Sequence, residues 1–85
     1  MQKKLEIIPK LDKNIIFFAR LLRASGISIG SDSILEAIES IKLVGMKNKQ
    51  SFFYALQTCL IKRPEDMKIF AQAFSLFWQN PKFRD

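Results

Sequence analysis

Few residues in this sequence could perform chemistry. The chain of 85 residues contains one cysteine, Cys59, and no histidine. A zinc site built from cysteine and histidine, a Cys–His dyad and a Ser–His–Asp triad are therefore all excluded. Cys59 lies on the apolar face of a predicted helix, where a cysteine acts as a small hydrophobe rather than as a nucleophile.

The hydroxyl and carboxylate groups also lack the spacing of a known site. The segment IGSDS, residues 29–33, combines a glycine with hydroxyl groups but lacks the Gly-x-x-x-x-Gly-Lys spacing of a phosphate-binding loop. Glu36 and Glu39 are three residues apart, and one acidic pair without a histidine is a weak indication of a metal site. We therefore expect a non-enzymatic protein with no cofactor and no metal ion.

Arg20 and Arg23 are the most informative charged residues, because they lie three residues apart in a segment with helical periodicity. They could lie near a helix C-terminus, where cations interact favourably with the helix dipole, or pair within the chain. Alternatively, they could clamp a carboxylate of a partner. We favour the first interpretation and expect Arg20 to pair with Glu65 or Asp66. Lys13 shares this basic arc, which is a candidate partner-binding site.

Helical periodicity predicts four helices that would position these residues. Asp12 and Asn48 are good N-cap residues, and Pro64 suits a first helical position. Gly26 and Gly45 are suited to end a helix. These signals place the helices at residues 13–24, 31–44, 49–62 and 64–79. No stretch alternates as a strand would, so the predicted fold class is all-α.

The length of the chain fits one small domain. An apolar fraction of 48% and eight phenylalanines predict a core built on aromatic side chains, with Trp78 buried in it. We expect a single-domain bundle of about four helices at residues 12–80. A short N-terminal arm at residues 1–11 precedes it, and a C-terminal tail at residues 81–85 follows.

A bundle of this size cannot easily cover every apolar face of its helices. The fourth predicted helix is apolar over more than half of its circumference, and the third carries Tyr54 and Ile61 away from its main face. We expect an exposed patch formed by Ile69 and Leu76, or by Tyr54 and Ile61. A contiguous patch of this kind marks a protein interface.

The chain is basic, with 14 lysine and arginine residues, eight acidic residues and a net charge of +6. This charge favours an anionic partner such as nucleic acid, a membrane surface or an acidic protein. A helix-turn-helix beginning at residue 18 would place Asp32 and Glu36 at the base edges, instead of the arginine, asparagine or glutamine that read bases. DNA reading is therefore disfavoured, and a small basic nucleic-acid-binding domain is the alternative function.

The sequence predicts a cytoplasmic protein that does not enter membranes. The lysines after Met1 are not followed by the apolar segment of a signal peptide. The longest apolar run, Ile15–Ala19, is too short to span a bilayer. The single cysteine is consistent with a reducing compartment.

Two blocks of the sequence resemble the N-terminal region of CoxE-like proteins, which contain a von Willebrand factor A domain. The blocks are FARLLRASGISIGSDSILEAI at residues 18–38 and FFYALQTCLIKRPEDMKIFAQAFSLFW at residues 52–78. The chain departs from the family pattern at Ser31 and Ala71, where proline and aspartate are frequent. Asp32 and Ser33 do not continue into the Asp-x-Ser-x-Ser sequence of the metal-ion-dependent adhesion site, so that site is not transferred.

The resemblance implies a role in protein docking. CoxE-like proteins are thought to act with MoxR-type AAA+ ATPases as chaperone-like pairs that mature metalloenzymes or complexes. The expected partner is therefore an AAA+ ATPase, a client protein or a downstream von Willebrand factor A domain, and a homo-oligomer is a further expectation. The chain would be either an N-terminal fragment or a stand-alone relative of that family.

Overall fold

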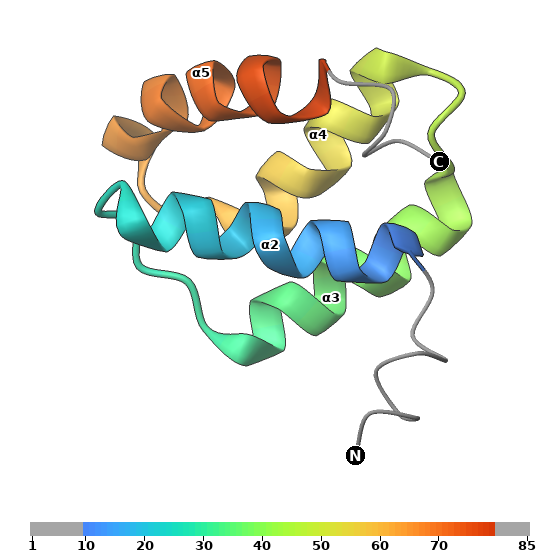
Figure 1. Cartoon of the computed structure of the whole chain (residues 1–85), viewed down its shortest axis with the longest axis horizontal. Coiled ribbons are helices and arrows are strands. Elements are labelled where there is room, and N and C mark those ends of the chain that lie inside the picture. Colours follow the sequence, from blue (N-terminus) through green and yellow to red (C-terminus); the bar gives the residue numbers. More distant parts are fainter. Residues whose placement is uncertain (1–9, 80–85) are drawn as a thin grey trace.

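The computed structural model describes residues 10–79 and forms a helical bundle, as the sequence predicts (Figure 1). Within this part of the chain every regular element is a helix. The elements in chain order are α2 (Lys10–Ala24), α3 (Ser31–Val44), α4 (Lys49–Leu60), the 3-10 helix η1 (Pro64–Asp66) and α5 (Met67–Trp78).

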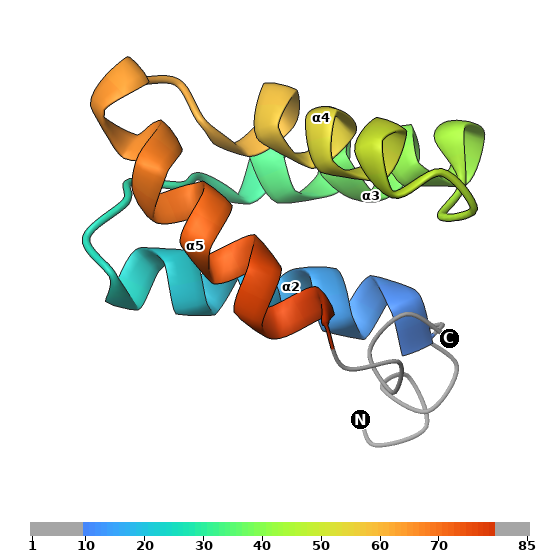
Figure 2. The ribbon, with the colours of Figure 1, turned by 90° about the horizontal axis from the view of Figure 1, so that it is seen from above.

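The helices are arranged in two layers. Figure 2 shows α3 and α4 side by side and antiparallel in one layer, while α5 crosses α2 in the other. Contacts of α2 with α3 and of α4 with α5 join the layers. Helices far apart in the sequence, α2 and α5, therefore form one face of the molecule.

The core is aromatic and is centred on Phe18 of α2. Its ring centroid lies 5.8 Å from that of Phe70, 5.3 Å from that of Phe77 and 5.7 Å from that of Trp78. Phe74 is also in contact, at 6.3 Å between centroids. Most of these pairs meet edge to face, the geometry that aromatic quadrupoles favour. The prediction of a buried Trp78 is confirmed, because only 2% of its surface is exposed.

Both glycines predicted to end a helix, Gly26 and Gly45, do so. Gly26 has a φ of 99° and Gly45 a φ of 80°, in the region that glycine adopts without steric strain. After α2, the amide of Ile27 donates to the carbonyl of Leu22 at 3.0 Å and that of Gly26 donates to Arg23 at 3.0 Å. This pair of bonds is the Schellman motif, and it turns the chain towards α3.

The N-cap of α4 is also confirmed. The side-chain Oδ1 of Asn48 accepts a hydrogen bond from the amide of Ser51 at 3.0 Å. This bond satisfies one of the amides that the first turn of a helix leaves without an intrahelical partner.

Three predicted boundaries need correction. Helix α2 begins at Lys10, so residues 10 and 11 belong to the bundle and not to an arm. Leu11 packs against the core, and Asp12 complements the dipole from within the first turn instead of capping it. Helix α4 ends at Leu60, and Pro64–Asp66 is a 3-10 turn before α5. The rest of the predicted arm, residues 1–9, and residues 80–85 with the predicted tail lie outside the described residues.

The position of Trp78 leads to a stability prediction. Truncating a buried tryptophan costs about 3–5 kcal/mol, and a domain of this size is stabilised by roughly 5 kcal/mol. Trp78→Ala should therefore leave the domain close to unfolding at room temperature in urea titrations followed by circular dichroism. Leu76→Ala is the matched control from the same helix, because Leu76 is 76% exposed and should change stability by less than about 0.5 kcal/mol. Similar midpoints for both variants would contradict the assignment of Trp78 to the core.

Candidate functional site

A groove lies between the last turns of α2 and the outer side of α5. We call it the α2–α5 groove, and it is an open hollow of about 200 Å³. Leu21 of α2 and Ile69 of α5 are each more than a third exposed, and Leu76 is far more exposed than either. Its lining residues are Leu21, Ser25, Ile69, Gln72, Ala73 and Leu76.

The groove contains one of the two patches that the sequence predicts. Ile69 and Leu76 lie two turns apart on α5 and both reach it. Leu21 contributes the α2 side of the groove. Its position in the sequence instead predicts a residue at the edge of the apolar helix face that packs in the core. Leu21 is exposed because α5 packs against the Phe18 side of α2 and leaves the Leu21 side to solvent.

Phe17 extends this apolar surface by one helical turn. It precedes Leu21 by four residues on α2 and is half exposed. The guanidinium carbon of Arg20 lies 6.0 Å from the centroid of the Phe17 ring. This distance is the outer limit of a cation–π contact, and Arg20 remains exposed.

The predicted pairing of Arg20 with Glu65 or Asp66 is wrong. Glu65 instead accepts hydrogen bonds from Arg63, at 2.6 Å from Nη2 and 3.0 Å from Nε. These bonds to the guanidinium hold the pKa of the Glu65 carboxyl below its usual value. Because Arg63 is only two residues from Glu65, this pair forms locally and needs no tertiary contact. Among residues 10–79, Arg63–Glu65 is the only ion pair, so Arg20 has no carboxylate partner there.

Arg23 has a structural role in the link between α2 and α3. Its Nε donates to the carbonyl of Ile29 at 2.8 Å, across six residues. The link also buries Ile27 and Ile29 against the core. The segment FARLLRASGISIG is therefore a packed corner. Lys13, the third residue of the predicted basic arc, is half-buried on α2, one turn before Phe17.

The second predicted patch does not form. Tyr54 is 53% exposed, but only 7% of Ile61 is exposed. The prediction extends helical periodicity to Ile61, whereas α4 ends at Leu60. Ile61 has extended backbone angles, with φ −107° and ψ 118°, and so its side chain turns back into the core.

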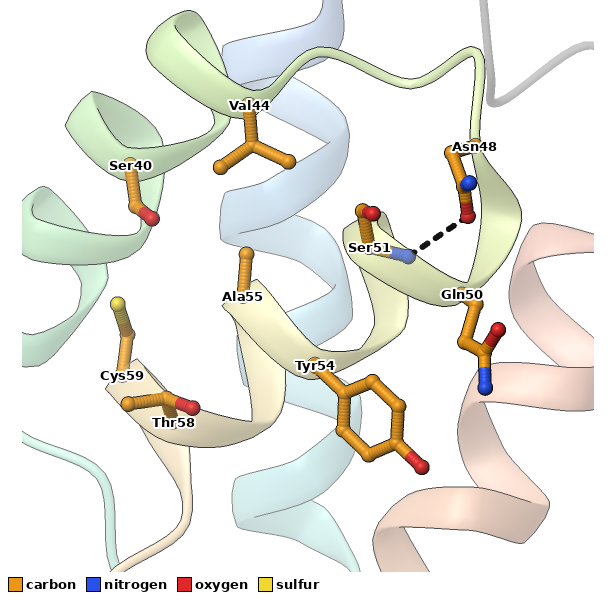
Figure 3. Close-up of a pocket in the computed structure, with 9 residues that line it drawn as sticks. All are labelled: Ser40, Val44, Asn48, Gln50, Ser51, Tyr54, Ala55, Thr58 and Cys59. Carbon is orange, nitrogen blue, oxygen red and sulfur yellow. Dashed lines mark hydrogen bonds between the residues drawn. The ribbon is translucent and has the colours of Figure 1, made fainter.

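Tyr54 lines a different hollow, between α3 and α4. This hollow is open, has a volume of about 620 Å³ and is drawn in Figure 3. Val44, Ala55 and Cys59 contribute apolar surface together with the ring of Tyr54, and hydroxyl and amide groups add polar surface. The polar side chains around it are Ser40, Asn48, Gln50, Ser51 and Thr58.

Cys59 lies at one end of that hollow with its sulfur towards Ser40 (Figure 3). Burial raises the pKa of the Cys59 thiol, and the carboxylate of Glu36 raises it further. The hydrogen bond with Ser40 acts in the opposite direction. A thiol with a raised pKa is protonated near neutral pH and is a poor nucleophile.

The described part of the chain presents no cluster of the side chains that commonly bind metal ions. Within residues 10–79, histidine, cysteine, aspartate and glutamate nowhere gather in a group of three that could hold a metal ion. None of the helices described has the length and apolar character needed to cross a bilayer. The α2–α5 groove differs from the hollow around Tyr54 in being lined mainly by apolar side chains.

Comparison with known proteins identifies one family. The sequence model of the CoxE N-terminal helical bundle domain matches residues 15–81, which is most of the chain. No curated protein and no solved structure matches significantly. The matched range contains all of α3, α4 and α5 and most of α2, so it includes both walls of the α2–α5 groove.

Arg23 and Arg20 provide a matched pair of substitutions. Arg23→Ala removes a partly buried hydrogen bond from a charged donor and should lower the free energy of unfolding by about 1–2 kcal/mol. Arg20→Ala, three residues away on the same helix, should change it by less than about 0.5 kcal/mol. Urea denaturation measures both. An equal loss of stability would contradict the different roles given to the two arginines.

Cys59 should react slowly with a thiol reagent in the folded protein near neutral pH. Its rate should rise to that of a free thiol when urea unfolds the chain, because unfolding removes the burial that raises the pKa. Since the folded state holds the thiol proton more tightly, this contribution to stability is present at neutral pH and is lost as alkaline pH ionises the thiol. Equal rates in folded and unfolded protein would show that Cys59 is accessible.

Proposed function

Because the chain belongs to the family of CoxE N-terminal helical bundle domains, we propose that it is a non-enzymatic domain that docks another protein. Membership of the family supports a docking role, and the α2–α5 groove is the surface that we propose for docking. Leu21, Ile69 and Leu76 are exposed together in one hollow between two helices. Contiguous apolar surface of this kind is typical of the centre of a protein interface.

The partner we propose is a MoxR-type AAA+ ATPase. This choice rests on the resemblance to CoxE-like proteins, which are thought to form chaperone-like pairs with such ATPases. In this proposal the domain holds the ATPase near a client during the maturation of a metalloenzyme or a protein complex. The ATPase would perform the chemistry, and the helical domain would contribute binding free energy.

Nucleic-acid binding is the alternative that the basic charge leaves open. The exposed first turns of α3 carry Asp32 and Glu36, which would repel phosphates at the position where a helix-turn-helix protein reads bases. Counterion release makes nucleic-acid affinity fall steeply as salt concentration rises. Titration with a DNA duplex at two salt concentrations therefore separates this alternative from docking through apolar side chains.

The docking proposal predicts that Leu76→Lys weakens binding without unfolding the domain. Leu76 is mostly exposed, so a lysine is tolerated in the folded state, but a charge in the groove cannot be buried by a partner. The affinity for a MoxR-type ATPase should fall by about tenfold or more. Co-purification and titration calorimetry measure this, and circular dichroism melting checks the fold.

Leu43→Lys is the control for that experiment. Leu43 is 90% exposed on α3, outside the α2–α5 groove, and receives the same change of charge. Its affinity for the ATPase should match that of the unmodified chain. Equal losses for the two variants, or none for either, would contradict docking at the groove.

A further inference from the structure

Charge is distributed unevenly over the two helices that form the groove. Between Lys13 and Gly30 the chain has no acidic residue, and α5 has none either. The basic residues of these segments are Lys13, Arg20, Arg23 and Lys68. Because the only ion pair within residues 10–79 joins Arg63 to Glu65, these four cations have no carboxylate partner in the described part of the chain.

Two of these cations flank the α2–α5 groove. Arg20 directly precedes the lining residue Leu21, and its exposed guanidinium lies over the ring of Phe17 on α2. Lys68 is exposed on α5, directly before the lining residue Ile69 and one turn before the lining residue Gln72. Each of the two helices thus carries an exposed cation next in sequence to a residue that lines the groove.

The acidic residues of the described chain lie elsewhere. Asp12 is in the first turn of α2, at the opposite end of that helix from the groove. Asp32, Glu36 and Glu39 are on α3, which lies on the other side of α2 from α5 in the view of Figure 1. Glu65 and Asp66 are in η1, before the start of α5, and Glu65 is already bound by Arg63. Carboxylates of a partner would thus meet unpaired cations beside the groove, whereas the acidic residues nearest along these two helices lie in the first turn of α2 and in η1.

We propose that the α2–α5 groove binds an acidic amphipathic helix of a partner protein. This inference rests on the proposed docking function and specifies the chemistry of what is docked. Ile69 and Leu76 are seven residues apart, a spacing of about 10 Å along a helix. A bound helix with apolar side chains at positions i, i+3, i+4 and i+7 presents a stripe of the same length. Its flanking glutamates or aspartates face Arg20 and Lys68.

A second copy of the same chain is a poorer occupant of this groove. Two copies meeting through the same face would bring Arg20 and Lys68 of one close to the identical cations of the other. Like charges across an interface disfavour association. The net charge of +6 adds repulsion at longer range. An acidic partner removes both penalties.

The test uses two synthetic amphipathic helices of about 18 residues, long enough to be helical in water. Both carry leucines at i, i+3, i+4 and i+7. One has glutamate and the other glutamine at the remaining outer positions. Fluorescence anisotropy of labelled peptides measures their affinity for the full chain. We expect the glutamate peptide to bind about tenfold more tightly at low salt, and the difference to shrink as salt is added.

Two double variants with the same net charge locate the effect. The double variant Arg20→Glu with Lys68→Glu reverses the charge of both cations. It should lower the affinity for the glutamate peptide by roughly fivefold for each reversal. Lys42→Glu with Lys47→Glu changes two exposed lysines outside the groove and should leave the affinity within about twofold. If a reversed variant melts early, Arg20→Gln with Lys68→Gln removes the same charges without adding carboxylates.

Several results would overturn the inference. Equal binding of the glutamine peptide would show that only apolar side chains are recognised, and equal losses for both double variants would show a response to net charge alone. If neither peptide binds while the ATPase complex still responds to Leu76→Lys, the docking function stands and the acidic helix does not. Preference for a DNA duplex with the same dependence on Arg20 and Lys68, or concentration-dependent self-association through them in light scattering, would replace the partner helix with another occupant.

Discussion

The contact between α2 and α5 through the ring of Phe18 is the interaction on which the rest of the structure depends. This small chain has one cysteine and cannot form an internal disulfide, so apolar burial must provide its stability. Four aromatic rings of α5 surround Phe18, and Phe52 of α4 meets Trp78 with centroids 5.0 Å apart. The same cluster thus joins both layers of the bundle.

The groove is a consequence of how that cluster is built. A helix that directs Phe18, Ala19 and Leu22 into the core must direct Phe17 and Leu21 to its flank. On α5, Phe70 and Phe74 point inward, and Ile69 and Leu76 fall on the flank for the same reason. Because the two helices cross, their apolar flanks meet at one hollow. The core and the groove therefore use different rows of side chains on the same two helices.

Local chemistry explains which features could be predicted from the sequence. The ends at Gly26 and Gly45 and the Asn48 cap depend on neighbouring residues alone, and the buried stripe of α2 follows from helical periodicity. Whether Arg20 meets a carboxylate depends on tertiary distances that the sequence does not contain, and among residues 10–79 it meets none.

The same reasoning accounts for the boundaries and groove residues that were mispredicted. Ile61 was misplaced because helical periodicity has no meaning beyond the last helical residue. Leu21 was missed as a groove residue because a helical wheel cannot show which flank a crossing helix leaves uncovered.

The enclosure of Trp78 gives the domain an optical reporter of its own. It is the only tryptophan of the chain, and its indole Nε1 is buried without a hydrogen-bond partner among residues 10–79. An indole kept from water and from hydrogen bonding emits at shorter wavelength than a hydrated one. The only tyrosine, Tyr54, is exposed on the other layer. Intrinsic emission therefore follows the integrity of the aromatic cluster, and a ligand that occupies the groove without disturbing that cluster leaves the signal unchanged.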